Sequence, residues 1–265
     1  MMPLASAELL HRLTQVGIAY TVARMRVIES RSGEPIGVRR YGEAVALLCR
    51  QVPSPHFNAV VGLRGGQERL IAEIDDWYRE HKIRPRFVAA PGDLTAEVGR
   101  ALAQRGFAAT DTETVLYGEA PTPVVPTSGH DIVEVDSPAL MEEFLDALLT
   151  GWSIAPEHHE PSKTNMRGWL GVPGWRLYLA RIDGKPAAAA KLFVKDGVGL
   201  FPDAATRPEF RGRGLQTALL RHRAAVAAGS GAELIYSQAR FGSISQHNME
   251  RIGMRVLCSR IIFTR

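Results

Sequence analysis

The sequence predicts an α/β (α+β) chain built from two similar halves, and three observations support this. Apolar segments of strand length alternate with amphipathic segments of helix length along most of the 265 residues. A glycine-rich turn leads into a helix once in each half. The same succession of turn, helix, strand, helix, glycine and strand recurs 147 positions later, from Gly65 to Gly212 and from Gly106 to Gly253. We interpret this recurrence as an internal duplication.

In the first half, apolar spacing of three and four residues predicts amphipathic helices over residues 6–16, 68–81 and 95–105. Runs rich in β-branched and aromatic residues predict strands at 20–29, 57–63, 85–89 and 113–117. Residues 36–50 fit either a helix or a strand, and Gly37 and Gly42 favour the strand. Gly106 is expected to end the third helix.

The prolines at 121, 123 and 126 predict a linker over residues 120–130, because proline lacks the N–H that a helix or sheet needs. The boundary therefore separates a first domain, 1–119, from a second, 131–265. In the second domain the same patterns predict helices at 138–150, 162–169, 215–228 and 243–252. They predict strands at 131–135, 175–182, 186–194, 198–206, 233–238, 254–257 and 260–264.

The composition argues against several classes of protein. The net charge of +4 comes from 32 basic and 28 acidic residues spread along the chain, which is weak evidence for a nucleic-acid partner. The two cysteines lie far apart and form neither a disulfide framework nor a CxxC motif. We find no signal peptide and no apolar run long enough to span a bilayer, so we expect a soluble cytoplasmic protein. The oligomeric state cannot be predicted from the sequence.

The segment Arg211-Gly212-Arg213-Gly214 lies between an apolar strand and an amphipathic helix. The first N–H groups of a helix have no partner within it, and the helix dipole adds positive potential there, so this junction suits an anion such as a phosphate. The P-loop spacing is not present, because Leu215-Gln216 follows the second glycine instead of Lys and Ser or Thr. The Rossmann spacing of three glycines is absent as well.

The segment resembles the pyrophosphate loop of the GNAT superfamily of N-acetyltransferases, whose pattern is Arg/Gln-x-x-Gly-x-Gly/Ala. Arg211 and Gly214 match this pattern, whereas Gln216 replaces a small residue. Downstream, Asn248 and Gly253 resemble the family's second signature, an Asn in a short helix that ends in Gly-Phe. Met254 stands where that Phe is usual. The order of strands and helices is that of the GNAT fold over the whole C-terminal half.

The resemblance implies two GNAT-like domains, each with a mixed, mostly antiparallel sheet, a splayed pair of strands and flanking helices. It implies acetyl-CoA as co-substrate, held at Ala204, Ala205, Thr206, Arg211, Gly212, Arg213, Gly214, Leu215, Gln216 and Asn248. The first domain has lost the loop spacing and carries Glu68 where a phosphate would bind. We therefore expect a degenerate first domain and a catalytic second one.

The activity implied is an acyltransferase reaction, in which a small-molecule primary amine attacks the acetyl thioester directly. A base must take the amine proton, and an acid protonates the leaving thiolate. The usual acid, a Tyr, is replaced by Met249. The catalytic candidates are Asp203 as base and Tyr236 and Ser245 as acids. The acceptor itself is not encoded in a shared motif.

The irregular segment after residue 150 is where the resemblance places substrate-binding loops. Its candidates for substrate contact are Trp152, His158 and His159. No metal is expected, because the two histidines lack a third ligand and no His-x-x-x-His helix is present. Two alternatives stay open: a non-catalytic acyl-CoA-binding or regulatory protein, and a protein-lysine acetyltransferase.

Overall fold

The computed structural model describes residues 2–52, 54–122 and 129–265. The chain divides into two compact units, each described here by itself. The N-terminal unit is formed by Leu4–Val115, Ala239–Phe241 and Val256–Arg265. The C-terminal unit is formed mainly by Leu116–Gln238 and Gly242–Arg255.

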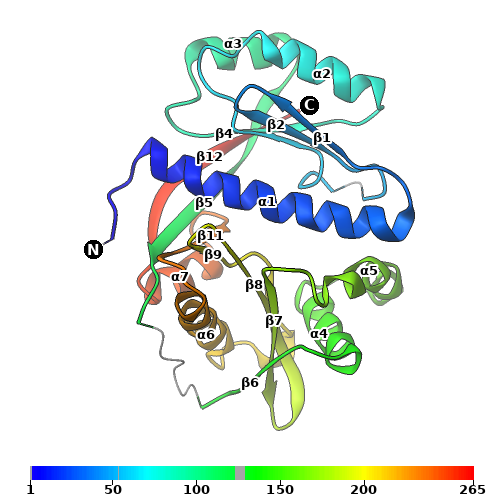
Figure 1. Ribbon diagram of the computed structural model, residues 1–265, viewed down its shortest axis with the longest axis vertical. Coiled ribbons are helices and arrows are strands. Elements are labelled where there is room, and N and C mark those ends of the chain that lie inside the picture. The colour runs from blue at the N-terminus through cyan, green and yellow to red at the C-terminus, as the bar shows by residue number, and fades with distance from the viewer. Residues whose placement is uncertain (1, 53, 123–128) are drawn as a thin grey trace. The chain divides into compact units, whose positions relative to one another are not determined.

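The N-terminal unit is an antiparallel hairpin continued by a parallel pair of strands and covered by three helices (Figure 1). Its elements are α1 (Ala7–Ser32), β1 (Gly37–Tyr41), β2 (Ala44–Leu48), β3 (Ala59–Val61), α2 (Leu70–Glu80), β4 (Arg86–Ala89) and α3 (Ala96–Gln104). Strands β1, β2 and β3 pair antiparallel, whereas β3 and β4 run parallel. Strand β12 (Arg255–Thr264) lies antiparallel to β4.

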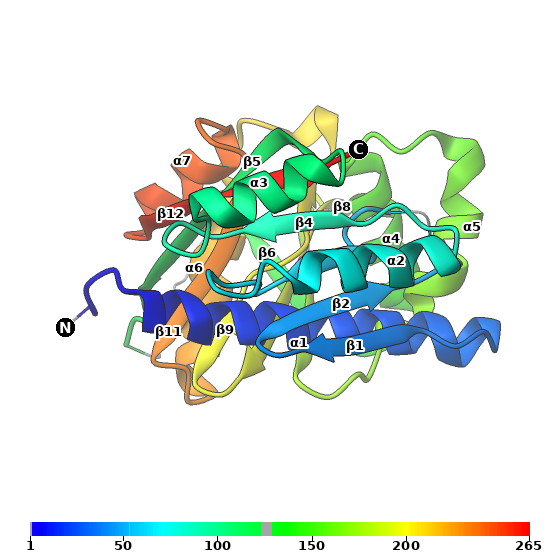
Figure 2. The same ribbon diagram turned by 90° about the horizontal axis from the view of Figure 1, so that it is seen from above.

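Helices cover both faces of this sheet, as Figure 2 shows with α2 and α3 on one side and α1 on the other. Strand β2 explains why, since all five of its residues are buried. Ala44, Ala46 and Leu48 share one cluster with residues of α2 and α3. Val45 and Leu47 point the opposite way, into a second cluster that includes residues of α1. The side-chain period of two in a strand thus supplies two apolar faces.

Helix α1 corrects the prediction of a helix at 6–16 and a strand at 20–29. Residues 7–32 form one helix, which begins at the Ser6 side-chain cap and ends at Gly33 with φ +72°. Buried residues recur through both predicted segments at helical spacing, from Leu13 to Tyr20 and Ile28. Tertiary burial along one face therefore outweighs the β propensity of the residues around Val22.

The C-terminal unit has a mixed sheet with helices on both faces (Figure 1). Its helices are α4 (Pro138–Gly151), α5 (His159–Met166), α6 (Leu215–Gly229) and α7 (Ile244–Arg251), with short 3₁₀ turns at Pro156–His158, Arg167–Trp169 and Pro208–Phe210. Its strands are β6 (Asp131–Glu134), β7 (Trp175–Ile182), β8 (Lys185–Lys195), β9 (Val198–Leu200), β10 (Ala204–Thr206) and β11 (Leu234–Ala239). Among the described residues of these six strands, β9 and β11 pair parallel, and the pairs β6–β7, β7–β8, β8–β9 and β8–β10 are antiparallel.

The two halves exchange their last strands, which the sequence did not predict. The end of β5 (Ala108–Glu119) belongs to the C-terminal unit, where β5 neighbours β11 and the N–H of Ala120 donates to the carbonyl of Glu233 at 2.8 Å. Residues 256–265 belong instead to the N-terminal unit. The expected domain limits 1–119 and 131–265 differ from this division, and most of the expected linker, 123–128, lies outside the described residues.

The duplication is visible in the structure. Each half has an antiparallel hairpin, β1–β2 or β7–β8, followed by a parallel pair, β3–β4 or β9–β11. Gly106 and Gly253 end matching helices, with φ of +80° and +92°. The same mixed α/β architecture therefore occurs once in each half of the chain.

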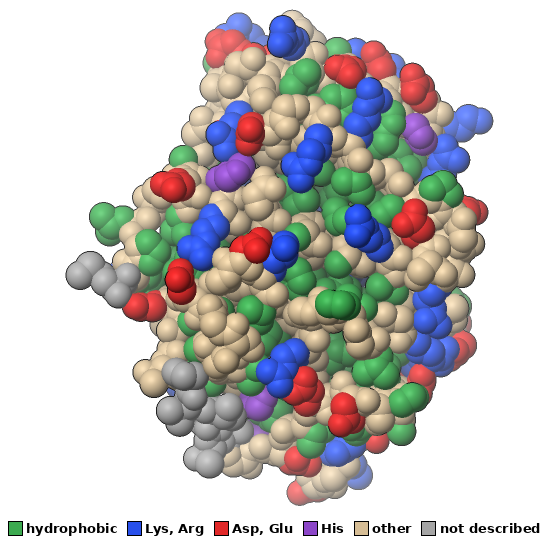
Figure 3. Space-filling view, viewed as in Figure 1, with side chains coloured by type: hydrophobic (Ala, Val, Ile, Leu, Met, Phe, Trp, Pro, Cys, Tyr) green, Lys and Arg blue, Asp and Glu red, His purple; other side chains and the backbone are tan. Residues whose placement is uncertain are grey.

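None of the described helices is long and apolar enough to cross a membrane. On the face drawn in Figure 3, Lys and Arg side chains alternate with Asp and Glu, so the described residues form no continuous basic patch there. This distribution agrees with the small net charge of the chain.

Candidate active site

The sheet of the C-terminal unit opens where β9 ends. The parallel pairing of β9 with β11 ends at Leu200 opposite Tyr236, and the N–H of Phe201 donates to the carbonyl of Tyr236 at 2.8 Å. Beyond this point β10 pairs with β8, while β11 continues to Ala239. The predicted strand 198–206 is thus two strands, separated by residues 201–203, and the predicted splay of two strands is present.

One edge of β10 faces the opening. The carbonyl of Asp203 and the N–H of Arg207 both form hydrogen bonds to β8. In an antiparallel pair every second residue bonds to the partner strand, so the N–H and C=O of Ala205 also point toward β8. The N–H and C=O groups of Ala204 and Thr206 then point away from β8. Apart from the carbonyl of Thr206, which accepts a hydrogen bond from Arg211, the groups of this short strand edge can bond an extended ligand.

The start of α6 lies next to this edge and has no side-chain cap. Gly214 is the N-cap residue, with φ +78°, and Gly212 has φ +77°. By contrast, Ser137 caps α4 and Ser243 caps α7 through their side-chain oxygens. The first N–H groups of α6 therefore have neither an intrahelical acceptor nor a cap, which is the arrangement that binds anions.

These elements surround a pocket of about 670 Å³. Nine of the ten predicted cofactor residues line it, namely Ala204, Thr206, Arg211, Gly212, Arg213, Gly214, Leu215, Gln216 and Asn248. The tenth, Ala205, is 5% exposed and does not line the pocket. Their role in binding a cofactor stays a prediction.

The side chains of Arg211 and Gln216 hold the wall of this pocket together. Arg211 donates from Nη2 to the carbonyl of Gly151 at 3.0 Å and from Nε to the carbonyl of Thr206 at 3.3 Å. Gln216 donates from Nε2 to Oγ1 of Thr206 at 3.3 Å. Gln216, which departs from the family pattern, thus lies against β10. Gly151, the last residue of α4, also lines the pocket and has no sequence motif that would reveal it.

The three catalytic candidates occupy different environments. Ser245 is exposed in the first turn of α7 and lines the pocket. Tyr236 is 1% exposed and does not line it, and its hydroxyl accepts a hydrogen bond from the amide of Gln238, which does. Asp203 lies between two lining residues, and one of its carboxylate oxygens is 3.1 Å from Nζ of Lys191.

Lys191 is a buried charge beside Asp203 that the sequence analysis missed. It lies on β8 among alanines and large apolar residues, and its side chain is completely buried. Its Nζ is 3.5 Å from the ring centroid of Trp169 and 3.9 Å from that of Trp175. A buried lysine needs such compensation, which a carboxylate and two aromatic faces supply. The only available signal was a lone lysine within an apolar strand.

The predicted substrate residues do not line the pocket of the C-terminal unit. His158 is exposed in a 3₁₀ turn, whereas the ring of His159 bonds through Nε2 to the carbonyl of Ile154 at 2.9 Å. Trp152 is partly buried at the end of α4. Their contact with a substrate stays a prediction. Within the described part of the chain, no group of three His, Cys, Asp or Glu side chains could hold a metal ion.

The matching loop of the N-terminal unit is closed by its own side chains. The N–H of Gly66 donates to the carboxylate of Glu68 at 2.7 Å, and the N–H of Arg64 donates to the side-chain oxygen of Gln67 at 3.2 Å. The carboxylate of Glu68 thus accepts the hydrogen bond of an N–H group near the start of α2, and this N–H is no longer available to an anion. This contrast between the two units supports the prediction that the first copy is degenerate.

Comparison with known proteins identifies the C-terminal half. Residues 138–253 match the model of the acetyltransferase (GNAT) family. This part of the chain is a GNAT acetyltransferase domain. Members of this family are acyltransferases that use acetyl-CoA. The matched segment contains the open edge of β10, the α6 loop and Asn248.

Solved structures share the fold over most of the chain. A conserved protein of unknown function from Staphylococcus epidermidis is 12% identical, with a TM-score of 0.66 over 86% of this chain and 92% of that one. A GCN5-related N-acetyltransferase from Kribbella flavida is 17% identical, with a TM-score of 0.63 over 91% and 94%. A tandem GNAT protein from the clavulanic acid biosynthesis pathway is 15% identical, with a TM-score of 0.58 over 78% and 74%. A search of curated proteins found no match.

Proposed function

We propose that this protein is an acetyl-CoA-dependent N-acetyltransferase that acts on the primary amine of a small molecule. The observation that carries this proposal is the pocket in which the uncapped start of α6 meets the open edge of β10. A phosphate-bearing thioester needs both features. The helix start can bind its phosphates, and the strand edge can bind its amide-containing arm.

The residues present fit acetyl-CoA in charge and in hydrogen-bonding pattern. The N–H groups from Gly212 to Gln216 can donate to a pyrophosphate, and the exposed Arg213 adds positive charge. The edge of Ala204 and Thr206 can pair with the two amides of pantetheine, as an added strand does. The pocket of about 670 Å³ lies within the range of small-molecule sites, about 300–1,000 Å³.

In the proposed reaction the amine nitrogen forms a bond to the acetyl carbon, and the bond from that carbon to sulfur breaks. The amine proton goes to a base, and the thiolate either takes a proton or leaves as such. Asp203 is the candidate base, and a proton accepted there would weaken its ion pair with Lys191. Ser245 has the better position of the two candidate acids, because it lines the pocket whereas Tyr236 does not.

Thermal unfolding with acetyl-CoA, and with ATP and NAD as anionic controls, tests the cofactor. A ligand at a hundred times its dissociation constant adds about 2.7 kcal/mol to the apparent stability. We expect acetyl-CoA alone to raise the melting temperature clearly. An equal shift with all three ligands, or no shift, would contradict the assignment.

Release of CoA thiol in the presence of a panel of small amines tests the transfer. We expect amine-dependent thiol release, measured against a control without amine because Cys49 and Cys258 are also free thiols. Met249, at the usual position of the acid, is buried against the pocket and favours one alternative, a non-catalytic acyl-CoA-binding protein. Acetyl-CoA binding without turnover on any amine would support that alternative.

A further inference from the structure

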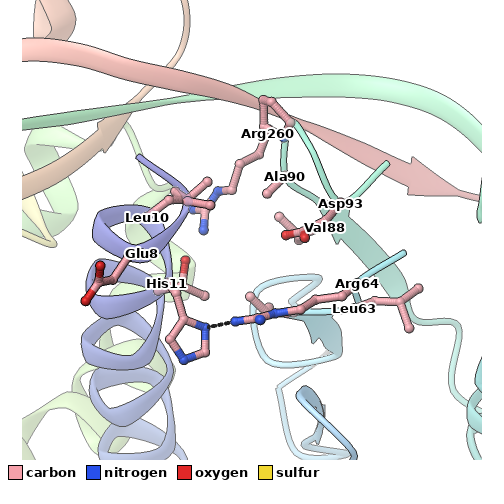
Figure 4. Close-up of a pocket in the computed structure, with 14 residues that line it drawn as sticks. Glu8, Leu10, His11, Leu63, Arg64, Val88, Ala90, Asp93 and Arg260 are labelled. Carbon is pink, nitrogen blue, oxygen red and sulfur yellow. Dashed lines mark hydrogen bonds between the residues drawn. The ribbon is translucent and has the colours of Figure 1, made fainter. Parts of the chain in front are cut away.

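The N-terminal unit contains a pocket of its own, which the proposed acetyl transfer does not use. It lies at the carboxyl ends of the parallel strands β3 and β4, between these ends and the first turns of α1 (Figure 4). This end of parallel strands is where open α/β sheets bind their ligands. The cavity measures about 340 Å³, close to the lower limit of about 300 Å³ for small-molecule sites.

This pocket is not a second CoA site. It has about half the volume of the pocket in the C-terminal unit. The loop before α2 is closed by Gln67 and Glu68, which bond to the N–H groups that a pyrophosphate would need. The ligand must therefore be small and must be recognised by the side chains that line the cavity.

One side of the cavity offers positive charge held in a defined position. Nη2 of Arg64 lies 2.7 Å from Nδ1 of His11, the interaction drawn as a dashed line in Figure 4. A guanidinium group can only donate, so Nδ1 of His11 must accept, and the imidazole carries its proton on Nε2. The remaining N–H groups of Arg64 can bind a carboxylate in bidentate fashion. The buried Arg260 lines the same cavity from β12, but its Nη2 pairs with the carboxylate of Glu113, so Arg64 is the cation expected to bind a ligand.

Asp93 places a carboxylate on the same side of the cavity as Arg64, facing α1. Asp93 follows β4, is partly buried and points into the cavity. Within the described part of the chain its carboxylate has no hydrogen bond or ion pair. Burial raises the pKa of Asp93, while the nearby charge of Arg64 lowers it. An unpaired, partly buried carboxylate is costly, and a bound ammonium group would compensate it.

The rest of the lining includes the exposed Glu8 and the partly buried Thr14, but its buried members form an apolar wall, namely Leu10, Leu63 and Val88. A ligand with a carboxylate alone would face Asp93, and a ligand with an amine alone would face Arg64. Only a molecule that carries both charges on a small, partly apolar body satisfies all three features.

We propose that the N-terminal unit binds a small α-amino acid with an apolar side chain in this pocket. The carboxylate of the ligand pairs with Arg64, its ammonium group pairs with Asp93, and its side chain lies against the apolar wall. This site is separate from the acetyl-CoA pocket and does not depend on the proposed acetyl transfer.

Isothermal titration calorimetry on the full chain tests this proposal with L-leucine, L-valine and L-methionine. Two analogues of leucine separate its charges, 3-methylbutylamine without the carboxylate and 4-methylpentanoate without the amine. We expect at least one amino acid to bind saturably at one site. For that amino acid, the matching single-charge analogues should bind about tenfold or more weakly, because each lacks one charge-assisted hydrogen bond.

Two variants locate the site, and each should weaken binding about tenfold or more by removing one charged partner. Arg64→Gln removes the anion partner, and Asp93→Asn removes the ammonium partner while keeping the side-chain shape. Arg26→Gln, at an exposed position of α1 outside the pocket, is the matched control and should bind as the parent does. Thermal unfolding without ligand checks that each variant is folded. If Asp93→Asn does not fold, the binding measurement on Arg64→Gln alone tests the location of the site.

Several results would overturn the proposal. Absence of binding by all three amino acids would refute it. Equal affinity for 4-methylpentanoate and leucine would show a simple anion site, and equal affinity for 3-methylbutylamine would show a cation site. Unchanged affinity in both folded variants would place the binding elsewhere on the chain.

Discussion

A methyl group added at Gly151 would collide with the strand that borders the proposed cofactor pocket. An ideal Cβ at this position would lie 2.6 Å from Cβ of Ala205 and 3.0 Å from the backbone nitrogen of Thr206. Carbon atoms in contact are about 3.5–4.0 Å apart, so β10 or the end of α4 must move by about 1 Å. Gly151→Ala is therefore expected to displace the edge of Ala204 and Thr206.

The overpacking should cost about 1–3 kcal/mol of unfolding free energy. A displacement of about 1 Å in a binding site can cost about a hundredfold in function, so acetyl-CoA affinity should fall at least tenfold. The carbonyl of Gly151 also accepts the hydrogen bond of Arg211, which the shift would strain. Urea unfolding measures the first effect, and the melting-temperature rise as a function of acetyl-CoA concentration measures the second.

Gly199→Ala provides a matched control. An ideal Cβ there would also lie 2.6 Å from another Cβ, that of Ala227 in α6, but Gly199 does not line the pocket. We expect a similar loss of stability with acetyl-CoA affinity close to that of the parent. If Gly151→Ala binds acetyl-CoA as the parent does, or if both variants lose affinity equally, β10 is not the binding edge.

Three further predictions concern single side chains. Gly214→Val should abolish the acetyl-CoA shift and leave the circular dichroism spectrum intact, because a β-branched residue at φ +78° strains the loop by about 1–2 kcal/mol; parent-like binding would refute the pyrophosphate assignment. Lys191→Met should cost about 3–5 kcal/mol in urea unfolding by breaking the ion pair with Asp203, and adding Asp203→Asn should recover part of it; a neutral single variant would contradict this. Burial against Tyr178 lowers the pKa of His222 in the folded protein. Its contribution to stability is therefore fully present above the unfolded pKa of about 6.5 and is lost as the pH falls through the folded pKa. Between pH 7 and 5, the free energy of unfolding should therefore fall less steeply with decreasing pH in His222→Gln than in the parent. An unchanged slope would show that His222 does not cause this pH dependence.

The sequence by itself determined the resemblance to the family and the position of the predicted cofactor loop. The loop could be predicted because Ala204 to Gln216 are contiguous, and the unusual backbone of Gly212 and Gly214 is encoded by glycine itself. Much of the order of helices and strands could also be predicted from local sequence, because the spacing of apolar residues reflects which side of each element is buried. The duplication was readable because equal spacing survives when side chains diverge.

Only the tertiary structure decided the rest, because those features join residues far apart in the chain. Strand edges pair with whichever partner the fold brings near, so nothing local assigns β12 to β4 rather than to the C-terminal unit. Helix α1 is continuous because a sheet face lies along it. The ion pair of Lys191 with Asp203 and the pocket of Arg64 and Asp93 depend on side chains that meet only after folding.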